Sequence, residues 1–143
     1  MKIKLGITLG DVNGIGPEVL IKAVSDSRIT DICTPVIYAS AKVISYHRKY
    51  VKVDNFVYNI AANKDKIVDG KINLVNCWTE NVNINLAATA DGGKYAKINI
   101  DSALYDLKEG NIDALVTAPI NKFAMDMYGF SLKVIQIILP AVF

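Results

Sequence analysis

The sequence predicts an α/β protein whose parallel sheet is covered by helices on both faces. Short β-prone runs alternate along the chain with segments in which apolar residues recur at helical spacing. Glycine or proline marks most of the junctions between them. Strands that alternate with helices form parallel sheets with helices on each side. The 143 residues, 52% of them hydrophobic and 21% charged, have the composition of one soluble globular domain.

The first half of the chain contains two strand and helix pairs. Ile3–Leu9 is a β-rich run that stops at Gly10, and a helical pattern begins just after Pro17. Pro35–Ala39 is the second expected strand. The segment Ser40–Lys49 has the apolar spacing of a helix and ends in a basic patch, which suits the negative end of a helix dipole.

The middle of the chain contains two further strand candidates, Asn55–Ile60 and Lys71–Val75. The polar turn around Asp69 and Gly70 separates them. Asn81–Asp91 shows neither the helical nor the strand spacing of apolar residues, so we expect an irregular connection there.

The last helices and strand follow in the same alternation. Gly92 and Gly93 open a long amphipathic helix that ends at Gly110. Ala114–Thr117 is a compact apolar strand. Pro119 begins the final helix at a favoured first-turn position, and Gly129 ends it.

The charge pattern argues against nucleic-acid and membrane partners. The 16 Lys and Arg are scattered among 14 Asp and Glu, so no face is built to neutralise a phosphate backbone. No run approaches the roughly 18 apolar residues that span a bilayer. The start of the chain is too short and too charged for a signal-peptide core, and we therefore expect a cytoplasmic protein.

The cysteines and the histidine suggest no metal centre in this chain. Cys33 and Cys77 are far apart, lie in no CxxC motif and have no histidine cluster nearby, so buried free thiols are expected. His47, the only histidine, lies in a basic helix end, and we assign it no role.

The first candidate binding segment is the glycine loop Thr8–Glu18. Its glycines let the backbone approach a ligand, and the following helix presents free N–H groups to an anion. The spacing fits neither G-x-G-x-x-G nor a Walker loop, which excludes a Walker-type phosphate cradle. A tight turn with Pro17 in the first helical turn explains the pattern equally well. Polar residues at a strand's carboxyl end favour a ligand site, so its candidates are Asp11, Asn13, Gly14 and Gly16.

The second candidate segment is Asp113–Lys122, where a strand again runs into a helix. Thr117, Asn121 and Lys122 place a hydroxyl, an amide and an ammonium group at the strand's carboxyl end, a combination suited to phosphate or carboxylate. Ordinary helix capping beside a solvated lysine is the alternative, and the pattern alone favours it.

Three segments together resemble the 4-hydroxythreonine-4-phosphate dehydrogenases of pyridoxal phosphate biosynthesis. They are Thr8–Glu18, Asp91–Ala96 and Asp113–Lys122, and their order and spacing match as well. The likeness runs from about Ile3 to Phe130. The third segment is nearly a signature of the family and far more specific than a lone glycine loop.

This resemblance implies an isocitrate/isopropylmalate-dehydrogenase-like fold, with two three-layer α/β/α domains and an active site in the cleft between them. The first domain alone is represented here, and it is incomplete. The family forms homodimers, oxidises the phosphorylated amino acid with NAD and decarboxylates it with a divalent metal such as Zn, Mg or Co. Thr117 and Lys122 are then candidate cleft residues, and Asp11 and Asn13 lie near the cleft. The NAD contacts stay unassigned.

Two other functions are compatible with the same residues. A paralogue could act on another phosphorylated hydroxy acid, such as threonate or erythronate phosphate. A non-catalytic module could keep the glycine loop to hold an anion or a nucleotide.

The resemblance stops after Gly129. The family continues with a Gly-His-Thr-Asp/Glu motif that binds substrate, and later histidines of a second domain hold the metal; neither is present here. We therefore expect a truncated amino-terminal domain at residues 1–130, a non-family tail at residues 131–143, and no second domain. One synonymous coding of Leu132–Phe143 reads Lys-Gly-His-Thr-Asp in a shifted frame, which suggests a one-base frameshift near Ser131 by mutation or sequencing error. Sequencing the gene tests this hypothesis.

We predict poor solubility and no measurable dehydrogenase activity for the 143-residue polypeptide. Val134–Leu139 is an uncharged, β-prone run without proline, typical of an aggregation hazard when exposed. The metal and substrate motifs of the family are also missing. A dehydrogenase assay with the purified chain checks this, and turnover of the phosphorylated substrate would refute it.

Overall fold

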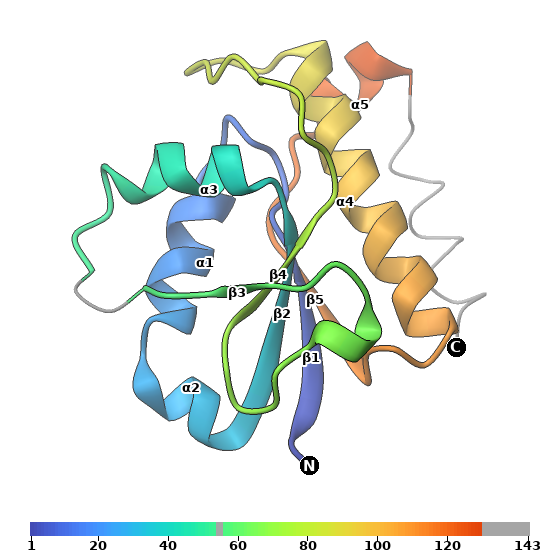
Figure 1. The fold of residues 1–143 in the computed structure, drawn as a ribbon. Helices are drawn as coiled ribbons and strands as arrows, with labels where there is room; N and C mark the ends of the chain where they lie inside the picture. The colour runs from blue at the N-terminus through green and yellow to red at the C-terminus, as the bar shows by residue number, and fades with distance from the viewer. Residues whose placement is uncertain (54–55, 130–143) are drawn as a thin grey trace.

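The computed structural model describes residues 1–53 and 56–129, which form three layers (Figure 1). A parallel sheet in the order β3-β4-β2-β1-β5 lies between α1, α2 and α3 on one face and α4 and α5 on the other. The strands are β1 (Ile3–Thr8), β2 (Cys33–Ala39), β3 (Asn59–Ile60), β4 (Asn73–Asn76) and β5 (Ala114–Thr117). The helices are α1 (Gly16–Val24), α2 (Ser27–Ile32), α3 (Ala41–Arg48), the short 3₁₀ helix η1 (Lys64–Lys66), α4 (Ala90–Lys108) and α5 (Lys122–Tyr128). The α/β prediction is confirmed.

The sheet is built around β1 and β2. Every residue of β2 is buried, as expected for a central parallel strand that is covered on both faces. Between the sheet and α1 and α3, the core contains Leu9, Ile21, Ile37, Ile44, Phe56 and Leu74. Beneath α4, alternate residues of β2 form a second cluster with Ala103 and Ile112. The alternation of β2 between the two clusters fixes its register, because a one-residue slip would exchange the faces.

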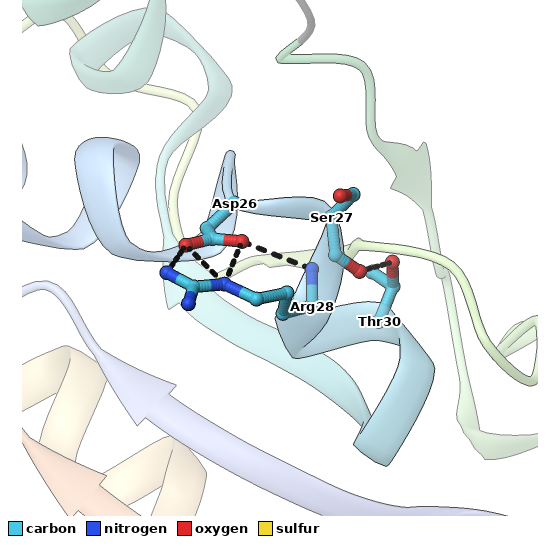
Figure 2. A network of polar contacts seen from close by, with 4 residues as sticks. All are labelled: Asp26, Ser27, Arg28 and Thr30. Carbon is cyan, nitrogen blue, oxygen red and sulfur yellow. Dashed lines mark hydrogen bonds and ion pairs between the residues drawn. The ribbon is translucent and has the colours of Figure 1, made fainter.

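Helix α2 was not anticipated. Asp26 accepts a hydrogen bond from the Arg28 backbone at 3.0 Å and also pairs with the Arg28 guanidinium, while Thr30 donates to the Ser27 carbonyl (Figure 2). The guanidinium lowers the pKa of Asp26 to about 2. The aspartate therefore caps this one-and-a-half-turn helix, which is too short to show an apolar period.

The expected helix start at Pro119 was wrong. Helix α5 begins at Lys122 because the Asn121 side chain accepts from the Ala124 backbone at 3.0 Å and caps the helix there. Pro119 lies in the preceding loop. The helix does end at Gly129, which has a φ of 90° and so adopts the left-handed conformation that favours glycine.

Other boundaries moved by a few residues. Helix α4 begins at Ala90, before Gly92 and Gly93, because the Thr89 hydroxyl accepts from the Gly92 backbone at 3.0 Å. Of the strand expected over Asn55–Ile60, the described residues 56–60 form only β3, at Asn59–Ile60. Strand β2 begins two residues before the expected Pro35, whose missing N–H faces no β4 partner since that pairing starts at Val36.

The described residues contain no helix that is long and apolar enough to cross a membrane. Cys33 is buried and Cys77 half-buried, and neither forms a disulfide. The expectations for residues 131–143 lie outside the described residues.

Asn99 joins helix α4 to the sheet. Its side chain is fully buried and donates to the Gly10 carbonyl at 3.2 Å and to the Tyr95 carbonyl at 2.8 Å. Since Gly10 is the residue at which the glycine loop leaves β1, this contact fixes the start of the loop against α4.

We predict that Asn99→Asp destabilises the protein by about 3 kcal/mol or more, because a buried acidic group would face two carbonyl oxygens in place of two donated hydrogen bonds. Asn81→Asp, at an exposed position, is the matched control and should change the free energy of unfolding by less than about 0.5 kcal/mol. Urea unfolding of both variants measures this. Equal stability of the two would show that Asn99 does not hold the loop.

Candidate functional site

The candidate site lies at the carboxyl edge of the sheet, between β1 and β5. These strands pair in parallel with Thr8 opposite Thr117, so the glycine loop and the Thr117–Lys122 corner leave the sheet side by side. From β1 the chain proceeds to β2 on one side, and later returns to β5 on the other. The sheet therefore has its topological switch point between β1 and β5, where open α/β sheets bind ligands.

Backbone contacts hold the two corners together. The Ala118 backbone N–H donates to the Thr8 hydroxyl at 3.2 Å, and the Asp11 N–H donates to the Pro119 carbonyl at 3.2 Å. Gly10, with a φ of 75°, packs against the same segment, where a side chain would meet the Pro119 carbonyl. Both corners therefore lie at one rim of the sheet, the carboxyl ends of β1 and β5.

Asp11 shapes the glycine loop from inside. Its carboxylate accepts from the Asn13 backbone N–H at 2.9 Å, and its carbonyl accepts from the Gly14 N–H at 3.0 Å. The residue is only 3% exposed. The geometry thus gives Asp11 a role in loop conformation, whereas Asn13, half-buried, and Gly14, exposed, are the loop residues that a ligand can reach.

Asn13 connects the loop to the start of α4. Its side-chain NH2 group donates to the Thr89 hydroxyl at 3.0 Å, and its side-chain oxygen Oδ1 accepts from the Asn85 backbone N–H at 2.8 Å. A Cβ at Gly92 would lie 2.7 Å from the Asp11 carboxylate and 3.0 Å from the Asn13 side-chain amide, so a side chain there would displace these two groups. All three segments that the sequence analysis singled out therefore meet at one place, although only two had been proposed as binding segments.

The polar residues of the Thr117–Lys122 corner differ in whether their side chains are accessible to a ligand. Asn121 caps α5, as the capping interpretation predicted. Thr117 and Lys122 are exposed, and among the described residues the Lys122 ammonium group forms no hydrogen bond or ion pair. A hydroxyl and a cation are therefore available to a phosphate or carboxylate beside the glycine loop.

Sequence reasoning missed the contact of His47 with the glycine loop. The ring is half-buried, and its Nε2 lies 2.8 Å from the Val12 carbonyl oxygen. Burial lowers the pKa of His47 below its ordinary 6.5, although this hydrogen bond and the charge of Glu18 partly oppose the effect. His47 does end a basic helix, as expected, but no local pattern reveals a partner 35 residues away.

Comparison with known proteins connects this geometry to a family. A family model described as pyridoxal phosphate biosynthetic protein PdxA matches residues 31–140. The chain belongs to the PdxA family.

Relatives of this PdxA-family chain are named as dehydrogenases, which makes it a member of an oxidoreductase family. It is 39% identical over 132 residues to a 4-hydroxythreonine-4-phosphate dehydrogenase of Bacteroides thetaiotaomicron, covering 91% of the chain. It is 31% identical over 121 residues, or 82% of the chain, to a Clostridium botulinum protein provisionally named D-threonate 4-phosphate dehydrogenase. The chain spans 36% of the length of each.

Solved structures share the fold. A 4-hydroxythreonine-4-phosphate dehydrogenase from Burkholderia phymatum superposes with a TM-score of 0.79 at 25% identity, covering 91% of this chain and 40% of that one. A Klebsiella pneumoniae enzyme of the same name gives 0.78 at 24% identity, covering 90% and 40%.

The described part of this PdxA-family chain does not provide a metal site. No group of three or more His, Cys, Asp and Glu side chains in residues 1–53 and 56–129 could hold an ion. The carboxylate of Asp11, within the glycine loop, already accepts a hydrogen bond from the Asn13 backbone N–H.

Gly14, which is exposed, and Gly16, which is buried at the start of α1, should respond differently to substitution. At Gly16 a Cβ would lie 2.5 Å from the Leu9 carbonyl, whereas at Gly14 the nearest atom is 3.5 Å away. We predict that Gly16→Ala lowers the free energy of unfolding by about 1–3 kcal/mol, as overpacking does. Gly14→Ala should leave it within about 1 kcal/mol. Urea unfolding compares them, and equal losses would contradict this loop geometry.

Proposed function

We propose that this chain is the amino-terminal part of an NAD-dependent dehydrogenase that oxidises and decarboxylates 4-hydroxythreonine 4-phosphate in pyridoxal phosphate biosynthesis. The chain by itself binds the phosphorylated substrate weakly and does not turn it over. The observation that carries the proposal is the shared rim, where exposed Thr117 and Lys122 lie beside the glycine loop at the switch point of the sheet.

Lys122 is the residue that we assign to the anionic end of the substrate. Its ammonium group is a mobile point charge, which suits a phosphate or carboxylate. The Thr117 hydroxyl donates a second hydrogen bond from the end of β5. The exposed Gly14 lets the ligand approach the loop backbone, and Asn121 sets the start of α5 and so the position of Lys122.

We assign no NAD contacts, and the described residues contain no group of side chains that could hold a metal ion. A divalent metal would stabilise the alkoxide and the enolate as a Lewis acid. No described group of side chains fits it, and we assign the residues of the rim to binding and orienting the substrate.

The remaining assignments follow from the family. We propose a cytoplasmic homodimer that acts on a small phosphorylated molecule, without nucleic-acid or membrane partners. We propose that residues 1–130 form its amino-terminal domain and that residues 131–143 are a tail without the family's Gly-His-Thr-Asp/Glu motif; the family model's match ends within this tail, at residue 140.

Threonate 4-phosphate is the second candidate substrate. The Clostridium botulinum relative, 31% identical, supports it through its provisional name. Both candidates carry a phosphate and a hydroxyl, so the rim residues serve either. The two ligands differ in the amino group at Cα, which threonate 4-phosphate lacks. A comparison of their binding affinities therefore distinguishes the two candidate substrates. A module that only holds an anion would not discriminate between them.

We expect Lys122→Ala to weaken binding of 4-hydroxythreonine 4-phosphate about tenfold, since a charge-assisted hydrogen bond is lost. Lys108→Ala, an exposed lysine at the end of α4, is the matched control and should bind like the unchanged chain. Isothermal titration calorimetry with this ligand, threonate 4-phosphate, 4-hydroxythreonine and NAD measures the affinities. Absence of binding by the unchanged chain, or equal loss in both variants, would overturn the proposal.

A further inference from the structure

The glycine loop is held by a residue outside the rim. We propose that His47 is the positioning residue of this loop, acting through a hydrogen bond from its Nε2–H to the Val12 carbonyl. Its bearing on substrate binding rests on the function proposed above, whereas its bearing on loop conformation does not.

The peptide group between Val12 and Asn13 is held at both ends. Its oxygen accepts from His47 Nε2 at 2.8 Å, and its N–H donates to the Asp11 carboxylate at 2.9 Å. The Val12 side chain is fully buried in the core. The orientation of this peptide plane is therefore fixed, and with it the direction in which Asn13 and the exposed Gly14 leave the loop.

The surroundings of the ring keep it in place. The Tyr46 ring packs edge-on against it, with centroids 5.3 Å apart. Glu18 on α1 is the charged group that acts on it from the neighbouring helix, and this carboxylate is paired with Lys22 at 2.7 Å. On its own helix, Arg48 lies over the Phe56 ring. The ring thus meets the loop from the α3 side without a direct ion pair.

A neutral ring can make this contact in only one tautomer. A carbonyl oxygen can only accept, so Nε2 must carry the proton and Nδ1 is bare. Burial lowers the pKa of His47 below 6.5, so the neutral form prevails at pH 7. Because the folded pKa is depressed, the stability linked to His47 is present above pH 6.5 and is lost as the pH falls through the folded value.

NMR of the unchanged chain tests the tautomer directly, because His47 is the only histidine. Ring nitrogen shifts at pH 7.5 should show Nε2–H, and the Val12 carbonyl shift should follow the ring as it titrates below pH 6.5. An Nδ1–H tautomer, or a carbonyl that ignores the titration, would overturn the proposal without any variant that must fold.

Variants separate positioning from general stability. We expect amide exchange at Asn13 and Gly14 to become about tenfold faster in His47→Ala, with partial rescue in His47→Gln, whose side chain can still donate. Lys49→Ala, an exposed cation of the same helix end, is the control and should leave both amides unchanged. Exchange in the middle of α4 should not change in any of them. Unchanged exchange at Asn13 and Gly14 in His47→Ala would refute the role.

Ligand affinity tests whether the hydrogen bond between His47 and Val12 affects substrate binding at the rim. His47→Ala should weaken binding of 4-hydroxythreonine 4-phosphate about tenfold and Lys49→Ala should not. If the unchanged chain does not bind this ligand, the proposed function fails, and the exchange and tautomer results still decide the role of His47. If it binds and His47→Ala binds equally well, His47 does not position the rim.

Discussion

The parallel pairing of β1 with β5 is the constraint on which the rest of the structure depends. It places Thr8 opposite Thr117 and brings together segments that lie more than a hundred residues apart. The order of the strands follows from right-handed crossovers, which put α1 and α3 on one face and α4 on the other. Gly6 of β1 packs beneath the side chains of Ile112 and Tyr38. A Cβ at Gly6 would lie 2.4 Å from the Ile112 side chain and 3.3 Å from the Tyr38 ring.

The glycine loop differs from a phosphate cradle because it satisfies much of its own hydrogen-bonding capacity. Asp11, inside the loop, accepts two of the backbone N–H groups that an anion would otherwise take. Asn13 then joins the loop to the Thr89 cap of α4. Such a loop is preorganised, so a ligand at the rim would not have to order it. The acidic Glu18 in the first turn of α1 also makes that helix end a poor anion site.

The sequence allowed the sheet and the two corners to be predicted because the signals were local. Ala114–Thr117 is a strand with the expected bounds, since an apolar run there is followed at once by a proline-containing corner. The start of α5 was misplaced, because a capping asparagine determined it rather than the proline. The burial of Asp11 and the contact of His47 depend on elements that meet only in the folded chain, and no spacing in the sequence encodes them.

The most direct test of the central claim is an amide chemical-shift titration of the chain with 4-hydroxythreonine 4-phosphate. If both corners form one binding rim, the amides of Gly14 and Lys122 should shift together, with the same apparent Kd. The amides of Asn63 and Lys64, which lie beside Tyr105 and Asp106 near the carboxyl end of α4, should not move. Shifts confined to one corner, or different affinities at the two, would contradict a single site at the carboxyl ends of β1 and β5.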